Sequence, residues 1–309
     1  MSQAITRHYS AFGKEIVKYF ELSKGIVFYD LTLGDGGHTE TALDSGCRVI
    51  SFDVDPEAIR RATDFLKSKH TPLIITDINL DKVGDEKWVI VNANFTKISE
   101  VVEKLKLPLA DAIMVDLGPS QFQVLSPQRG FSFLVDEPLD MRLSPELGVT
   151  AADLLGCLNE GELSNLFSLG DEPFAKPIAR AVVKRRQISP IKTTLQLADL
   201  VKRVKRSPRG KTNPATQVFM ALRMAVNLER EVINELLPQL PKLLSPNGIL
   251  GVISFHSGED RIVKNFLKEE EQKGTLSAIY QKPCLPKQEE LEISNRTRSA
   301  KLRLARKNN

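Results

Sequence analysis

Five short apolar runs recur along the chain, and each has the length of a β-strand. They cover residues 26–31, 48–53, 88–93, 112–116 and 249–255. Because these runs are apolar almost throughout rather than alternating with polar residues, they are typical of parallel strands covered by helices on both faces. The pattern predicts an α/β protein with an open, largely parallel sheet.

Polar residues after the second run indicate where a helix begins. Asp55 suits the N-cap position and Pro56 the first helical position, where the N–H group that proline lacks would have no helical partner. Ile59, Ala62 and Leu66 then share one face of the helix, which we expect to be buried. Capping gives Asp55 a structural role.

The interval between the runs at 112–116 and 249–255 is far longer than a crossover helix needs. A second domain is therefore expected inside the first. We predict a discontinuous sheet domain made of residues 1–119 and 216–309, interrupted by an inserted domain at 120–215. The overall length also suits about two domains.

The inserted segment has the periodicity and the start signals of helices. Two pairs resemble capping boxes, and an Asn-Pro step opens a further helix: Thr150 with Asp153, Thr193 with Gln196, and Asn213 with Pro214. We therefore expect the insertion to be helical.

Near the end of the chain, Ala300, Leu302 and Leu304 alternate with basic residues. This pattern predicts a last strand that pairs at an edge of the sheet and exposes its basic face. The segment at 71–87 is interpreted as a loop or a small excursion before the third run.

Charge is unevenly distributed along the chain. The 309 residues carry a net charge of +4, but residues 176–211 hold twelve Lys or Arg and a single acid, Asp199, so the rest of the chain is acidic. A solvated helix face is the alternative, although such faces usually mix both signs. The run favours binding of a polyanion such as nucleic acid, with Lys184, Arg185 and Arg186 at its densest part.

Three widely spaced cysteines form no pair or cluster, which favours neither a disulfide framework nor a metal site. A reducing, cytoplasmic setting fits this usage. Charges interrupt the first twenty residues, so we expect no signal peptide and no membrane span. Nothing in the sequence indicates an oligomeric state.

The segment YDLTLGDGGH at 29–38 joins the first apolar run to a glycine-rich turn. Gly34 and Gly36 allow a sharp turn and let a ligand approach the backbone. Asp53 ends the second run, where nucleotide-binding folds place a carboxylate for ribose hydroxyls. The combination suggests an adenosine cofactor, while a tight turn without any ligand explains the glycines equally well.

The third glycine of the dinucleotide pattern is replaced by Thr39. This substitution disfavours a pyrophosphate and hence a nicotinamide-dependent oxidoreductase, which stays an alternative. S-adenosylmethionine has ribose hydroxyls but no phosphate, so it suits the turn better.

Asp116 ends the fourth run and precedes LGPS, which breaks the strand at the edge where ligands bind in open α/β sheets. Capping the next turn is its alternative role. His256 follows the fifth run; it either contacts substrate or bonds an active-site loop. Ser257 is expected to cap the following helix, whose first turn holds Glu259 and Asp260.

Residues 129–145 are non-periodic and rich in aromatic and charged side chains, as is typical of an active-site loop. Phe131 and Phe133 either stack on an unstacked base or anchor the loop to the core. Asp140 and Arg142 are further candidates for contact with substrate.

Eight segments, in this order, resemble the ribosomal RNA small subunit methyltransferase H family: DLTLGDGGHTE, FDVDPEAI, DLGPSQFQ, RGFSF, PLDMR, NPATQVFMALRMAVN, ISFHSGEDRIVK and RTRSAKLR. The resemblance implies a class I S-adenosylmethionine-dependent methyltransferase sheet, Rossmann-like, with an inserted helical domain. It also implies methylation of the N4 amine of a cytidine in the decoding region of small-subunit ribosomal RNA.

The resemblance further implies a set of cofactor contacts, namely Gly36, Gly37, His38, Asp53, Phe95, Asp116 and Gln123. Phe95 would lie against the adenine. We assign the catalytic role to Asp116, or to a carbonyl in residues 117–119, as hydrogen-bond acceptor for the amine. The partner would be small-subunit ribosomal RNA or the small subunit itself. The alternative is a non-catalytic RNA-binding or ribosome-assembly protein on the same fold.

Overall fold

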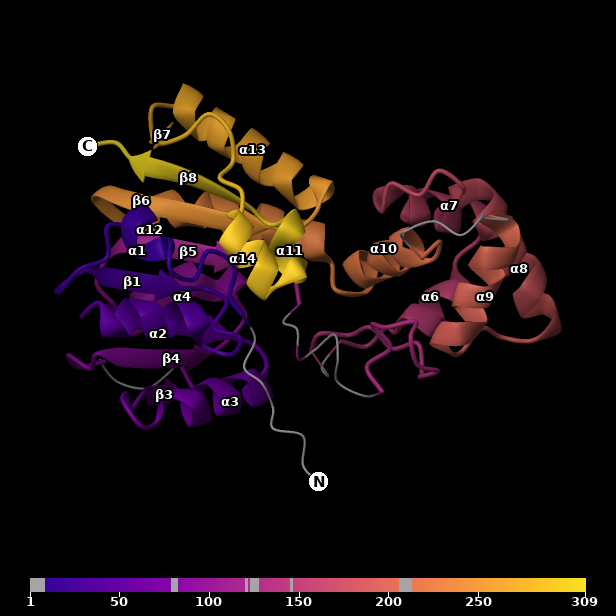
Figure 1. Cartoon of the computed structure of the whole chain (residues 1–309), viewed down its shortest axis with the longest axis horizontal. Coiled ribbons are helices and arrows are strands. Elements are labelled where there is room, and N and C mark those ends of the chain that lie inside the picture. The colour runs from indigo at the N-terminus through magenta and orange to yellow at the C-terminus, as the bar shows by residue number, and fades with distance from the viewer. Residues whose placement is uncertain (1–8, 79–82, 120–121, 123–127, 145–146, 206–212) are drawn as a thin grey trace. The chain divides into compact units, whose positions relative to one another are not determined.

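The computed structural model describes residues 9–78, 83–119, 122, 128–144, 147–205 and 213–309. The chain divides into two compact units (Figure 1). Met1–Gly118 and Arg230–Asn309 form the sheet unit, and Pro119–Glu229 form the inserted unit.

Eight strands form one sheet in the order β3-β4-β2-β1-β5-β6-β8-β7. The strands are β1 (Val27–Asp30), β2 (Arg48–Asp53), β3 (Leu73–Ile75), β4 (Trp88–Asn92), β5 (Ala110–Asp116), β6 (Leu244–Ser254), β7 (Leu276–Ala278) and β8 (Lys301–Lys307). The first six pair in parallel, and β8 pairs antiparallel with β6 and β7. All five apolar runs are confirmed as strands, and with them the α/β class.

Two expectations about the sheet were wrong. The segment 71–87 contains β3, a strand of three apolar residues of which two are exposed, and this run is too short to predict a strand by itself. Strand β8 lies between β6 and β7 rather than at an edge, because the short β7 covers its outer side. Its basic side chains bond within the protein, as Arg303 does with Asp260 of helix α13 (Ser257–Gln272) at 2.7 Å.

Helices cover both faces of the sheet. Alternate residues of one strand enter opposite cores: Tyr29 joins the cluster that includes α4 (Ile98–Lys104), α11 (Glu229–Leu236) and α13, and Phe28 joins the cluster that includes α1 (Ile16–Tyr19), α2 (Gly37–Asp44) and α3 (Pro56–Leu66). Burial on both sides explains the continuous apolar runs. Two short α-helices and two 3-10 helices also belong to this unit: α12 (Leu240–Leu243), α14 (Gln288–Ile293), η2 (Leu237–Gln239) and η3 (Asn295–Ser299).

The inserted unit is helical and has a core of its own. The helices that the structure describes in it are α6 (Ala151–Cys157), α7 (Glu160–Leu169), α8 (Ala175–Ile188), α9 (Thr194–Lys205) and α10 (Thr216–Val226). The expected return to the sheet domain at residue 216 comes too early: α10 buries Val218 and Leu222 in the core of the inserted unit, beside Phe167 of α7. The observed division falls after Glu229 instead.

The starts of α3 and α6 show the expected capping chemistry. Asp55 accepts a hydrogen bond from the Glu57 N–H at 3.0 Å, and Thr150 and Asp153 form a reciprocal capping box. Gln196 accepts from the Thr193 N–H, which supplies one half of the second box. No helix among the described residues is long and apolar enough to cross a membrane.

Candidate active site

Strand β1 pairs with β2 on one side and with β5 on the other. The chain builds the sheet outward from β1 in one direction and then in the other, so the strand order changes direction between β1 and β5. In open α/β sheets, ligands bind at the carboxyl edge of such a switch point. Asp30, Asp53 and Asp116 are the last residues of these three strands. The switch point therefore carries three carboxylates.

The glycine turn lies directly after β1. Gly34 and Gly36 have positive φ angles of 52° and 75°, and Gly36 is the N-cap of α2. A Cβ on Gly36 would also lie 3.2 Å from Ala62 Cβ and Leu66 Cδ1 of α3, closer than an ordinary van der Waals contact. The turn thus needs glycine for its own packing, whether or not a ligand is bound.

Asp53 braces this turn. Its Oδ2 accepts a hydrogen bond from the Gly34 N–H at 2.9 Å, and its Oδ1 accepts one from the Asp55 N–H at 2.9 Å. Desolvation of the carboxyl group raises the pKa of Asp53 to about 7, although both N–H groups act against this shift. Each carboxylate oxygen keeps a lone pair, as a contact with ribose hydroxyls would require.

Asp116 differs from Asp53 because its Oδ1 is buried and has no hydrogen-bond partner among the described residues. Its backbone N–H donates to Thr32 Oγ1 of the turn at 2.8 Å. Burial raises the pKa of Asp116 well above its usual range, and the charges of Asp30 and Glu259 add to this shift. An unpaired buried acceptor is costly, so it marks a place for a donor or a positive charge.

Asp30 is a functional candidate that the sequence analysis missed. Its Oδ2 accepts a hydrogen bond from Thr39 Oγ1 at 2.8 Å, and Thr39 lies 2.8 Å from Ser51 Oγ. The Trp88 indole N–H donates to the same Ser51 oxygen at 3.2 Å. Thr39, which replaces the third glycine of the dinucleotide pattern, therefore holds a buried carboxylate. Burial raises the pKa of Asp30.

The other proposed cofactor residues of the sheet unit have different surroundings. His38 is buried, and its Nε2 lies 2.7 Å from the Ala11 carbonyl oxygen, which ties the N-terminal segment to α2. A Cβ on Gly37 would collide with Ser10 Oγ of that segment. Phe95 opens η1 (Phe95–Lys97) after β4 and packs partly buried against the core. Gln123 lies outside the described residues.

His256 caps a helix. Its Nδ1 accepts from the Gly258 and Glu259 N–H groups at 3.2 and 3.4 Å, so His256, not Ser257, is the N-cap of α13. The imidazole replaces the serine hydroxyl because the helix begins one residue earlier than expected. Glu259 accepts from the Phe255 N–H at 2.9 Å and completes the cap. The geometry gives His256 a structural role and leaves substrate contact a proposal.

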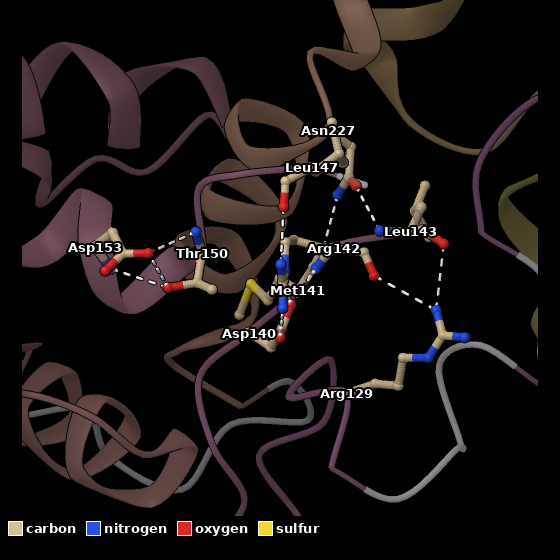
Figure 2. A network of polar contacts seen from close by, with 9 residues as sticks. All are labelled: Arg129, Asp140, Met141, Arg142, Leu143, Leu147, Thr150, Asp153 and Asn227. Carbon is tan, nitrogen blue, oxygen red and sulfur yellow. Dashed lines mark hydrogen bonds and ion pairs between the residues drawn. The ribbon is translucent and has the colours of Figure 1, made fainter. Parts of the chain in front are cut away.

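In the inserted unit, Asp140 and Arg142 face each other (Figure 2). Arg142 donates to both carboxylate oxygens at 2.8 and 2.7 Å and to the Leu147 carbonyl at 2.8 Å. Asn227 accepts from the Leu143 N–H at 2.7 Å and donates to the Met141 carbonyl at 2.8 Å. These bonds hold the loop to itself and to the end of α10, which is a positioning role for both charged residues.

The aromatic and basic candidates separate into anchored and exposed groups. Phe133 packs edge-on against Phe219 with ring centroids 5.1 Å apart, and Phe131 also packs against the core of the inserted unit. Arg185 and Arg186 bond backbone carbonyls within the unit, whereas Lys184 is exposed. Core packing therefore explains both phenylalanines, and Lys184 is the most available of the three cations.

A sequence model of the MraW methylase family matches residues 5–308. The chain belongs to the MraW methylase family. Ribosomal RNA small subunit methyltransferase H of Carboxydothermus hydrogenoformans is 38% identical, covering 97% of each chain. The protein of that name from Dictyoglomus turgidum is also 38% identical, covering 94% of each chain. A solved rRNA methylase from Streptococcus thermophilus aligns with 96% of this chain at a TM-score of 0.43 and 10% identity, too low to carry an argument.

Membership makes this methylase an S-adenosylmethionine-dependent enzyme with a class I methyltransferase fold. The chemistry of the switch point fits that cofactor. Three carboxylates suit a ligand with a sulfonium and an ammonium group, and a turn without an anion cradle suits a ligand without phosphate. Membership of this family also excludes the alternative of a nicotinamide-dependent oxidoreductase.

Proposed function

We propose that this methylase transfers the methyl group of S-adenosylmethionine to the N4 amine of a cytidine in the decoding region of small-subunit ribosomal RNA. Relatives that cover nearly the whole chain at 35–38% identity have the name ribosomal RNA small subunit methyltransferase H. The structural observation that carries the proposal is the buried Oδ1 of Asp116, which has no hydrogen-bond partner in the described part of the chain. Because the proposed substrate is the small ribosomal subunit or its RNA, we also propose that the reaction takes place in the cytoplasm.

The cytosine amine is a weak nucleophile because its lone pair is delocalised into the ring. An acceptor for its N–H groups favours the pyramidal nitrogen that attacks, stabilises the positive charge that develops on this nitrogen, and receives the proton that the nitrogen loses once it is methylated. Asp116 Oδ1 is such an acceptor, and the carbonyls of residues 117–119 follow it in the chain. A cationic ligand at this edge favours the ionised form of Asp116. S-adenosylmethionine supplies the activated methyl group when bound.

The remaining residues of the switch point hold the cofactor in this proposal. Asp53 accepts hydrogen bonds from the ribose hydroxyls, and the backbone at Gly36 and Gly37 lets the ligand approach closely. Phe95 offers its ring to the adenine. Asp30 contributes negative charge next to Asp116. No covalent nucleophile is required, because the methyl group is already activated.

The decisive experiment is transfer of labelled methyl from S-adenosylmethionine to purified small ribosomal subunits, followed by nucleoside analysis. N4-methylcytidine is the expected product, and a parallel reaction with naked ribosomal RNA tells which form is the substrate. An active enzyme excludes the alternative of a non-catalytic assembly protein. Label in another nucleoside, or none, contradicts the proposal.

The role of Asp116 is tested by Asp116→Ala. We expect transfer to fall by about 10²–10³-fold, because one preorganised acceptor is lost at the reacting nitrogen. Calorimetric titration with the cofactor should show that binding persists. Asp64→Ala on the exposed side of α3 is the matched control and should transfer at the parent rate. A fully active Asp116→Ala enzyme would remove Asp116 from the mechanism.

A further inference from the structure

The cations of the basic run do not all have the same surroundings. Arg186 donates to the Leu155 and Leu158 carbonyls at the end of α6, both at 2.7 Å. Lys205 donates to the buried Glu172 at 2.8 Å and to the Pro214 carbonyl at 3.0 Å. These residues satisfy buried acceptors of their own unit. They are therefore structural cations that an external anion would not reach without loss of stability.

Helix α8 carries three cations of a different kind. Lys176, Arg180 and Lys184 follow one another at intervals of four residues and are all exposed. The opposite face of the helix buries Ile178 and Val182. Positions four apart on a helix lie on one face at a step of about 6 Å. The three side chains thus form a single line on the outer face of α8.

Little within the described residues neutralises this line. Helix α8 contains no acidic residue. Arg180 contacts Glu160 at 3.3 Å, and both side chains are exposed, so this pair is weak and open to exchange. Lys176 and Lys184 have no ion pair or hydrogen bond among the described residues. The line is consequently available to an external polyanion.

We propose that Lys176, Arg180 and Lys184 on the outer face of α8 bind the sugar–phosphate backbone of the substrate RNA. The inference rests on the proposed function. A row of point charges with a step of about 6 Å suits the regularly spaced phosphates of an RNA strand. Lysine and arginine contacts to phosphate position a nucleic acid without reading its bases. The α8 line therefore supplies affinity, while the choice of cytidine is made at the switch point.

The test combines Lys176→Gln with Lys184→Gln, which removes two charges at exposed positions. The matched control combines Lys264→Gln with Lys268→Gln, two exposed lysines on α13 of the sheet unit. Binding of a labelled single-stranded RNA oligonucleotide of arbitrary sequence is measured between about 50 and 200 mM salt. The α8 double variant should lower the slope of log affinity against log salt by about 1.4, at about 0.7 for each lost phosphate contact. The control should keep the parent slope.

Methyl transfer separates this inference from the proposed function. With the α8 double variant, KM for small subunits should rise while kcat at saturating substrate stays at the parent value. Lys176→Arg with Lys184→Arg should restore the parent KM. An unchanged salt slope and KM would overturn the inference even if methyl transfer is normal, and so would an equal loss in the control. Transfer to a different nucleoside with an intact RNA affinity would instead contradict the proposed function alone.

Discussion

At the scale of single residues, the candidate site is a group of carboxylates that disfavour one another's charge. Asp30 and Glu259 raise the pKa of Asp116, and Asp30 and Asp55 raise that of Asp53, in addition to the effect of burial. Two backbone N–H groups compensate Asp53, whereas Asp116 has one buried oxygen without a partner among the described residues. Ionising these carboxyl groups is therefore unfavourable at this edge of the sheet, and a cationic ligand makes it more favourable.

The raised pKa of Asp53 predicts how stability varies with pH. In the unfolded chain an Asp titrates near 3.9, and in the folded protein Asp53 titrates at about 7. Between these values the folded state holds a proton that the unfolded state has lost, so stability falls as pH rises and levels off above about 7. Asp53→Asn removes this contribution.

The measurement is the Tm of parent and Asp53→Asn, without cofactor, at several pH values from about 4 to 8. Relative to the parent, the variant should gain Tm as pH rises through this window. The other raised carboxylates are present in both proteins, so the difference isolates Asp53. A constant difference in Tm would show that Asp53 has an ordinary pKa.

At the scale of elements, the inserted unit depends on a close approach of α7 to α10. Gly170 ends α7, and a Cβ there would collide with the Gln217 carbonyl oxygen and lie 2.9 Å from Ala221 Cβ. Gly156 in α6 is exposed, and a Cβ there would meet nothing within 4 Å. The same substitution therefore has opposite effects at the two positions.

We expect Gly170→Ala to destabilise the inserted unit by about 1–3 kcal/mol, because the helices must separate to admit the methyl group. Gly156→Ala should stabilise it by about 0.5–1 kcal/mol, because alanine loses less backbone entropy in a helix. Urea denaturation followed by far-UV circular dichroism measures both. Equal effects of the two substitutions would contradict the assigned packing.

At the scale of the whole molecule, the two units have separate hydrophobic cores, and tryptophan fluorescence comes from the sheet unit alone. Trp88 is the single tryptophan of the chain and lies buried in β4 of the sheet unit. Its indole N–H belongs to the hydrogen-bond chain through Ser51 and Thr39 to Asp30. Tryptophan fluorescence therefore reports unfolding of the unit that carries the switch point.

S-adenosylhomocysteine, the product of the cofactor, should stabilise the fluorescence-detected transition. At a hundredfold excess over Kd the gain is about 2.7 kcal/mol, because the ligand binds only the folded unit. Asp53→Asn should reduce this gain, and Gly156→Ala, in the inserted unit, should leave it unchanged. A gain seen by circular dichroism but not by Trp88 fluorescence would place the cofactor outside the sheet unit.

The sequence predicted much of this molecule, and particular residues show where it stopped. Apolar runs gave five strands, and the residues that end two of them, Asp53 and Asp116, lie at the switch point. Asp30 ends the observed strand β1, but it lies inside the apolar run at 26–31, so the run did not mark it as a residue at the end of a strand. The local sequence of HSGED did not show that His256, rather than Ser257, caps α13.

By itself, the sequence determined the α/β class, the parallel core and the capping of α3 by Asp55 and of α6 by Thr150, because these follow from burial of strands on both faces and from local hydrogen bonds. Only the tertiary structure decided which side chains are engaged and which are available. Lys184 and Arg186 look alike in sequence, but Arg186 satisfies carbonyls at the end of α6 while Lys184 meets solvent. The physical reason is that the partners of a charged side chain often come from distant parts of the sequence. Folding brings these partners close to the charge, so the sequence around the residue does not predict them.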